Sequence, residues 1–137
     1  LDDLQAAILR ARLPVLMEWT IRRRTLAARY RRLLPPSVRT IPGRGPGHVY
    51  HLFPVLLAER EALQAHLASA GIDTMVHYPM ALTTQPAFAT FVSHECPVAA
   101  AAAAELLSLP LSPRLTDADI VRVADEVAAF AKGHRLA

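Results

Sequence analysis

Lysine and cysteine are almost absent from this sequence. Cys96 is the single cysteine among 137 residues, which excludes an intrachain disulfide and suits a reducing compartment. Lys132 is the single lysine, so the formal net charge of +3 comes almost entirely from arginine. Any reaction that requires a lysine amine on this chain therefore depends on that one residue.

A long apolar run is also absent. The residues are 53% hydrophobic and the mean hydropathy is +0.24, but much of this is alanine. No run approaches the roughly 18 residues that a membrane-spanning helix needs, and Glu105 closes the tract at residues 98–104. Asp2, Asp3 and Gln5 interrupt the start, so no signal peptide is expected. We expect a soluble cytoplasmic protein of one domain with a modest core and no membrane contact.

Residues 1–34 are predicted to form one long helix, because apolar residues recur there at three- and four-residue steps. These positions are Leu4, Ile8, Ala11, Val15, Trp19, Leu26, Tyr30 and Leu33. Pro14 interrupts the pattern, since it removes a backbone donor and clashes one turn back. We therefore expect a kink at Pro14, or two helices in tandem.

Arginine is concentrated in the second half of this helix. The residues are Arg22, Arg23, Arg24, Arg29, Arg31 and Arg32. Such a run usually forms a solvated helix face, and the alternative is a surface for phosphate groups of a ligand or a nucleic acid. Trp19 and Tyr30, the nearby aromatic residues, fall on the apolar stripe rather than among the arginines, which argues against nucleic-acid binding.

After a proline- and glycine-rich connector at residues 35–47, strands and helices are predicted to alternate. Strands are expected at 48–57, 72–76 and 107–111; helices at 59–70, 97–106 and from 117 onward; and a helical turn at 85–91. Pro54 marks an edge or a bulge, and the alanines of the second helix suggest close packing on a neighbour. Residues 48–137 should thus form a small α+β domain of about three strands with helices on one face, while the first helix docks elsewhere.

Histidine and cysteine do not gather into a metal-binding pattern. His48 and His51 would lie on opposite faces of the predicted strand, so they could not bind one ion together. His94, Glu95 and Cys96 are adjacent but lack a second cluster. The sequence predicts no metal site.

Residues 71–88 are the best candidate for a ligand site. Gly71 ends one predicted helix, and His77 and Tyr78 should project from the end of the strand that follows. Pro79 stops that strand, and a polar loop with Thr83 and Thr84 comes next. Strand ends and the loops after them are where rigid scaffolds present functional side chains. The alternative for His77 is a histidine satisfied by local backbone.

Six motifs, in this order and spacing, resemble the C-terminal part of the DegT/DnrJ/EryC1/StrS aminotransferases. They are residues 1–10 (LDDLQAAILR), 18–19 (EW) with 22–24 (RRR), 48–53 (HVYHLF), 76–79 (VHYP), 85–88 (QPAF) and 107–113 (LSLPLSP). The resemblance covers almost the whole chain. It implies the small C-terminal domain of a pyridoxal-phosphate enzyme of aspartate-aminotransferase-like fold type I, preceded by the long helix.

The resemblance also implies a function. The family aminates keto sugars carried on nucleotides, with glutamate or glutamine as donor, and His77 and Tyr78 would contact the nucleotide sugar. Its Schiff-base lysine and most of its cofactor pocket belong to a preceding large domain, and Lys132 has no such context. No catalytic or cofactor-binding residue is therefore expected here, and pyridoxal phosphate is not expected to bind to the chain alone.

This sequence departs from the family pattern at three places. Threonine stands in the segment 80–85 (MALTTQ) where the family usually has a histidine, and Pro14 and Pro54 fall where the family usually lacks proline. The first departure weakens the transfer of a substrate-binding role. The prolines suggest relaxed constraint.

Two other functions stay open at this point: a non-catalytic module that pairs with another chain, and a basic helical nucleic-acid binder. If the large domain is absent, the apolar stripe of the first helix should lack partners. The affected residues would be Leu4, Ile8, Val15, Leu16 and Trp19. Large apolar patches mark interfaces, so we expect a homo-oligomer or a partner chain.

Overall fold

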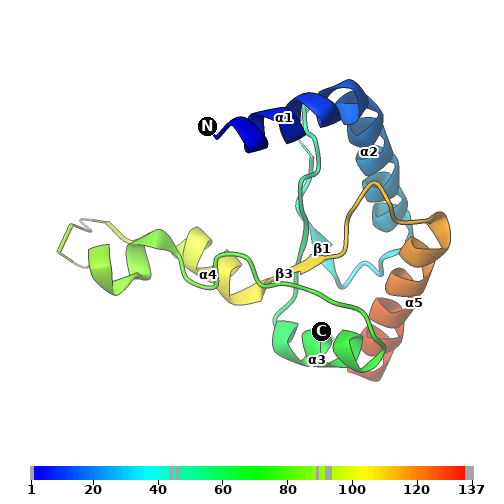
Figure 1. Cartoon of the computed structure of the whole chain (residues 1–137). Coiled ribbons are helices and arrows are strands. Elements are labelled where there is room, and N and C mark those ends of the chain that lie inside the picture. Colours follow the sequence, from blue (N-terminus) through cyan, green and yellow to red (C-terminus); the bar gives the residue numbers. More distant parts are fainter. Residues whose placement is uncertain (1, 44, 46, 89, 92–93, 135–137) are drawn as a thin grey trace.

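The computed structural model describes residues 2–43, 45, 47–88, 90–91 and 94–134 (Figure 1). Leu1, residues 44 and 46 of the predicted connector, residue 89 of the predicted turn and residues 135–137 lie outside this part. No helix in the described ranges is both long and apolar enough to cross a membrane.

The predicted first helix consists of two helices in tandem. Helix α1 (Asp3–Arg12) begins where the Asp2 carboxylate accepts a hydrogen bond from the Leu4 amide at 2.9 Å. A single 3-10 turn, η1 (Leu13–Val15), contains Pro14 and connects α1 to helix α2 (Leu16–Leu33). The break at Pro14 is confirmed, because proline cannot donate the hydrogen bond that a continuous helix requires.

Three short antiparallel strands form the sheet in the order β1–β2–β3. They are β1 (Arg39–Thr40), β2 (Phe53–Leu56) and β3 (Leu106–Leu109). The register pairs Arg39 with Leu56, and Phe53 with Leu109. The predicted fold class, a small α+β unit of about three strands, is confirmed, but the strands are not all the predicted ones.

The strands predicted at 48–57 and 72–76 are shorter in the structure, and the sequence did not predict β1. The strand predicted from residue 48 begins only at Phe53, because Tyr50 has a φ of 49° and its amide donates to His48 Nδ1 at 3.0 Å, which turns the chain. The strand predicted at 72–76 is reduced to one bridge, between Met75 and Ser108. β1 lies inside the segment predicted to be a connector.

Pro54 lies in the central strand rather than in an edge strand. β1 pairs only with Val55 and Leu56 and does not reach Pro54, which is paired on one side with Ser108. Proline is tolerated where a strand has a neighbour on one side only, so this position is a local edge. No bulge is needed to accommodate it.

The helix predicted at 59–70 begins and ends within one residue of those bounds, and the helix predicted from 117 begins there. Helix α3 (Arg60–Ser69) is followed by Gly71 with a φ of 71°, and the Ile72 amide returns to the Leu67 carbonyl at 2.9 Å. Helix α5 (Asp117–Gly133) opens with a capping box in which Thr116 and Asp119 each accept from the other's amide. The end of α3 and the start of α5 are therefore set by local chemistry.

One apolar core joins the sheet to α2, α3 and α5. Phe53 and Val55 lie on the same face of β2 and are buried. Their core neighbours include Leu26, Ala27, Tyr30, Leu63, Leu67, Leu107, Leu109, Ile120, Val123, Val127 and Phe130. The second half of the first helical segment thus belongs to this core, contrary to the prediction that it docks elsewhere, because the Tyr30 ring stacks on Phe53 at 4.9 Å.

The described part of residues 82–105 extends away from the apolar core and packs little against it. It contains the 3-10 turns η2 (Leu82–Thr84) and η3 (Pro86–Phe88) and helix α4 (Pro97–Glu105), which Figure 1 shows leading away from α2 and α5. η3 confirms the helical turn predicted there. The predicted close packing of α4 is wrong for the described residues, since none of its residues is buried.

Candidate functional site

His77 and Tyr78 lie directly after the point where the chain leaves α3 and touches β3. Ile72 is buried, and Met75 exchanges two backbone hydrogen bonds with Ser108, at 2.9 and 3.3 Å. His77 Nδ1 lies 2.9 Å from the Ser108 hydroxyl. The partner of His77 is therefore a side chain 31 positions away and not the local backbone.

Tyr78 is presented to solvent in an unusual backbone conformation. Its φ is 57°, in the left-handed region, and 81% of its surface is exposed. A non-glycine residue held there costs roughly 1–3 kcal/mol and persists where the surroundings fix it, often at a functional site. The two predicted residues thus differ: the His77 ring is hydrogen-bonded and half-buried, while the Tyr78 ring stands out from the surface.

The polar loop after Pro79 contributes to a separate hollow. Thr83 and Thr84, together with Glu95, Cys96 and the start of α4, line an open cavity of about 400 Å³. His77 and Tyr78 do not line it. Glu95 and Cys96 were not predicted to lie beside this loop, and nothing in the sequence indicates that they do.

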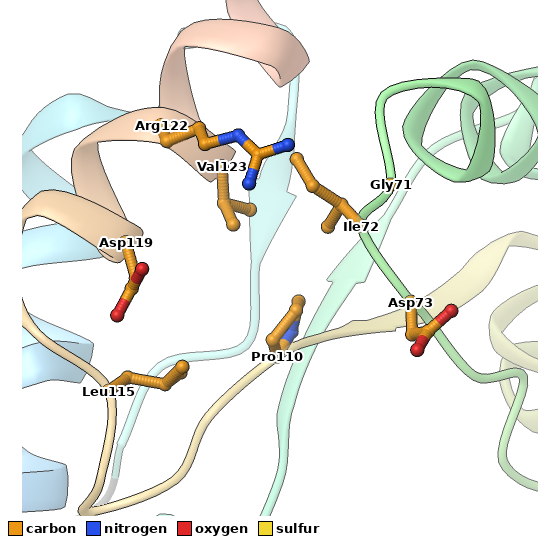
Figure 2. Close-up of a pocket in the computed structure, with 8 residues that line it drawn as sticks. All are labelled: Gly71, Ile72, Asp73, Pro110, Leu115, Asp119, Arg122 and Val123. Carbon is orange, nitrogen blue, oxygen red and sulfur yellow. The ribbon is translucent and has the colours of Figure 1, made fainter.

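A second hollow, shown in Figure 2, lies between the end of α3, the end of β3 and the start of α5. Its volume is about 190 Å³, and its lining is Gly71, Ile72, Asp73, Pro110, Leu115, Asp119, Arg122 and Val123. Arg122 donates to the Ala70 carbonyl, which connects α5 to the end of α3. Cavities that bind small molecules usually measure about 300–1,000 Å³, so this hollow is too small for a nucleotide sugar.

The Asp119 carboxylate, which lines that hollow, has a lowered pKa. Hydrogen bonds from the Thr116 backbone amide and then from its hydroxyl lower the pKa of Asp119, and Arg122 adds to the effect. These contacts belong to the cap of α5. The lowered pKa of Asp119 therefore reflects helix capping rather than catalysis.

Several arginines of α2 do not form a solvated face, because they connect α2 to other elements. Arg22 and Arg29 both pair with Asp117 at the start of α5, at 2.9 and 2.6 Å. Arg31 donates to the Tyr50 hydroxyl at 3.0 Å. The pairs with Asp117 hold α2 against α5, and all three contacts leave less arginine available to a nucleic acid.

The histidines weighed as metal ligands at positions 48 and 51 lie outside the strands. His48 and His51 precede β2, so the argument from opposite strand faces does not apply to them. His48 Nδ1 accepts a hydrogen bond from the Tyr50 amide, and the centroids of the His48 and Tyr50 rings lie 4.1 Å apart. No group of three or more potential ligands gathers anywhere in the described ranges.

Ser108 is the residue that sequence reasoning missed. It is 5% exposed, between the buried Leu107 and Leu109, and it holds both the backbone of Met75 and the ring of His77. A polar residue in a buried strand needs a hydrogen-bond partner, which was the available signal. The identity of that partner depends on tertiary structure.

The only lysine is remote from these features. Lys132 is exposed in the last turn of α5, and it lines neither hollow. His77 and Tyr78 can therefore hydrogen-bond a ligand through an imidazole and a phenol group. Neither supplies an amine nucleophile.

The chain matches known proteins along nearly its whole length. The model of the DegT/DnrJ/EryC1/StrS aminotransferase family matches residues 1–128. The dTDP-3-amino-3,4,6-trideoxy-alpha-D-glucose transaminase of Streptomyces venezuelae is 40% identical over 96% of this chain and 36% of its own length. The pleiotropic regulatory protein of Geobacillus stearothermophilus is 40% identical over 95% of this chain and 37% of its own length.

The structures agree with the sequences. The crystal structure of S. venezuelae DesV in complex with a ketimine intermediate superposes with a TM-score of 0.87 at 40% identity, covering 96% of this chain and 37% of that one. The chain thus spans little more than a third of the length of the relatives that it matches. Since the family model, the sequences and the fold agree, the chain belongs to the DegT/DnrJ/EryC1/StrS aminotransferase family.

Proposed function

We propose that this chain is the C-terminal portion of an enzyme that transfers an amino group to a nucleotide-linked keto sugar, and that it is inactive alone. The observation that carries the proposal is the match itself: 40% identity to a dTDP-amino-sugar transaminase over 96% of this chain but only 36% of that enzyme. The lone lysine supports the second half of the proposal. A portion without a suitable lysine cannot supply the amine that the family chemistry uses.

The residues present do not fit the cofactor of the family. Pyridoxal phosphate is held through a lysine in a pocket that orients the ring. Lys132 is exposed in the last turn of α5, followed by Gly133, and lines no hollow described above. The cofactor therefore has to be held by the rest of the enzyme, and we derive no catalytic step for this chain.

The role proposed for this chain's own residues is contact with the nucleotide sugar through His77 and Tyr78. Tyr78 is 81% exposed, so its ring is available to stack on a base or sugar and its hydroxyl to hydrogen-bond. His77 offers an imidazole nitrogen beside it. The left-handed backbone at Tyr78 supports this role, because strain of this kind gathers where a side chain must be aimed.

The exposed apolar stripe of α1, η1 and the first turns of α2 is proposed to be the docking face for the rest of the enzyme. Its large side chains are between 45% and 70% exposed. They are Leu4, Ile8, Leu9, Leu13, Leu16, Met17 and Ile21, whereas Val15 and Trp19, which were also predicted to lack partners, are half-buried. Many large exposed apolar side chains in one part of a chain mark an interface. The same face would serve a non-catalytic pairing module, which is the second candidate function.

Complementation tests the proposal. The chain is purified alone and together with the portion of the S. venezuelae transaminase that it does not match, and both samples receive pyridoxal phosphate. One aliquot of each is reduced with borohydride to trap an adduct, and an untreated aliquot is assayed for amino transfer. We expect no reduced adduct on Lys132 in the isolated chain, and amino transfer only in the complex. An adduct on Lys132 of the isolated chain contradicts inactivity, and a complex that forms without transfer favours the pairing module.

The substrate contact is tested in the same complex by titration with thymidine diphosphate and with an amino-accepting sugar nucleotide. His77→Ala should weaken sugar-nucleotide binding by about 0.5–1.5 kcal/mol, the value of one neutral hydrogen bond. Melting should change little, since His77 is only half-buried. The matched control is His51→Ala, an exposed histidine outside the strands. Collapsed melting with unchanged affinity would show that His77 is structural.

A further inference from the structure

Ser108 makes three hydrogen bonds from a buried position in β3. Its amide donates to the Met75 carbonyl at 2.9 Å, its carbonyl accepts from the Met75 amide at 3.3 Å, and its hydroxyl lies 2.9 Å from His77 Nδ1. Met75 and His77 are two residues apart on an extended segment. Ser108 therefore contacts that segment at two points, one through its backbone and one through its side chain, directly before Tyr78.

The direction of the side-chain hydrogen bond follows from the burial of Ser108. The residue is 5% exposed, and in the part of the chain that the structure describes its hydroxyl has no hydrogen-bond partner except His77. If His77 Nδ1 donated, the Ser108 hydroxyl would have to bury its own hydrogen without an acceptor, which costs about 1–3 kcal/mol. If the hydroxyl donates, both groups are satisfied.

We infer that Ser108 is a positioning residue that fixes His77 in the tautomer with its proton on Nε2, and so makes His77 a hydrogen-bond donor beside Tyr78. Donation by the hydroxyl makes Nδ1 an acceptor, and a neutral imidazole then carries its proton on Nε2. The ligand atom that such a group recognises is an acceptor oxygen, on a phosphate or a sugar. This ligand role rests on the proposed function, whereas the tautomer does not.

The first experiment reads the tautomer directly in the full chain by long-range proton–nitrogen NMR of the histidine rings. We expect His77 to show a protonated Nε2 and an unprotonated Nδ1. Ser108→Ala should release it to an average of both tautomers, and Ser108→Thr should restore it, because threonine keeps the hydroxyl and suits a strand. Ser69→Ala, which removes an exposed hydroxyl beside His66, is the control.

Two results would overturn the tautomer assignment. One is a proton on Nδ1 in the parent chain. The other is a His77 spectrum that does not respond to Ser108→Ala in a variant whose melting shows it to be folded. If Ser108→Ala does not fold, Ser108→Thr decides alone: it overturns the assignment if it folds and does not show the proton on Nε2.

The second experiment separates this inference from the proposed function. In the complemented complex, titrated with thymidine diphosphate and the sugar nucleotide, Ser108→Ala and His77→Ala should each weaken binding of the sugar nucleotide roughly two- to tenfold. The double variant should be no weaker than His77→Ala, because Ser108 acts through His77. If only His77→Ala weakens binding, the positioning role is wrong and the proposed contact stands. If the tautomer responds but neither variant weakens binding, the hydrogen bond stands and the proposed contact fails.

Discussion

Helices α5 and α1 have similar local sequence patterns but differ in how far their apolar residues are buried. Both begin at a capped N-terminus, at Thr116 and Asp2, and both carry apolar residues at helical spacing. In α5 these residues are buried against the sheet, α2 and α3, whereas α1 has no buried residue. The apolar stripe of a helix thus specifies that a partner exists, and only tertiary structure supplies it. In α1 the exposed apolar side chains belong to the docking face proposed above.

The largest expected effect comes from making the same substitution in both regions. Leu67→Ala, at a site with no exposed surface in α3, should lower the free energy of unfolding by about 2–5 kcal/mol, because it leaves a cavity. Leu9→Ala, at a site that is 56% exposed in α1, should change it by less than about 0.5 kcal/mol. Urea unfolding of both variants measures the difference. Equal losses would mean that α1 is packed in solution.

A charge placed among the exposed apolar side chains of α1 and η1 should weaken association and leave folding unchanged. Leu13→Glu places a carboxylate at a side chain that is 67% exposed. Burying a leucine is worth about 1.5–3 kcal/mol, so self-association or binding of the complementing portion should weaken at least roughly tenfold. Sedimentation velocity over a concentration series measures it, with Arg12→Glu as a charge control on the same segment. A parent chain that is monomeric and binds no partner would contradict the docking face.

The core should also be sensitive to alkaline pH through Tyr30. Burial raises the pKa of the Tyr30 phenol above its ordinary value of about 10, and the negative charge of Asp119 adds to this. Above about pH 10 the unfolded chain loses that proton and the folded chain keeps it, so stability should fall by about 1.4 kcal/mol per pH unit. The loss continues until the folded-state pKa is reached.

Tyr30→Phe separates this effect from general alkaline unfolding. The variant loses the hydrogen bond from the Tyr30 hydroxyl to the Pro110 carbonyl, which is 2.9 Å long and worth about 0.5–1.5 kcal/mol. Its stability should then depend less steeply on pH above about 10. Tyr78→Phe, at an exposed ring, is the control for the loss of a tyrosine hydroxyl outside the core. Equal slopes for Tyr30→Phe and the parent would show that Tyr30 ionises normally.

Sequence patterns predicted those elements whose ends are decided locally. Gly71 and Thr116 fix the end of α3 and the start of α5 within a few residues, and Pro14 breaks the first helix. The strands were predicted less well, because their bounds depend on pairing. Tyr50 turns the chain before β2 although its neighbours favour a strand.

The candidate site shows the same limit. His77 and Tyr78 stand out in the sequence, between a helix end and a proline. Ser108 does not, since it lies 31 residues further on and only pairing at Met75 brings it to His77. The family resemblance supplied the fold, but a contact between two segments could not be predicted from either segment alone.

The smallest expected effect concerns the ion pairs that hold α2 against α5. Asp117→Asn removes the pairs with Arg22 and Arg29, at 2.9 and 2.6 Å, but Asp117 is 49% exposed, so water and salt screen both. Exposed pairs are worth about 0.2–1 kcal/mol each, and we expect a total loss near the lower end of their sum. Asp125→Asn, on an exposed face of α5, is the control for the charge itself. The difference between the two variants should shrink in 1 M salt, where the screening length falls to about 3 Å. A difference that salt does not change would mean that Asp117 acts through the geometry of its hydrogen bond with Arg29 and not through charge.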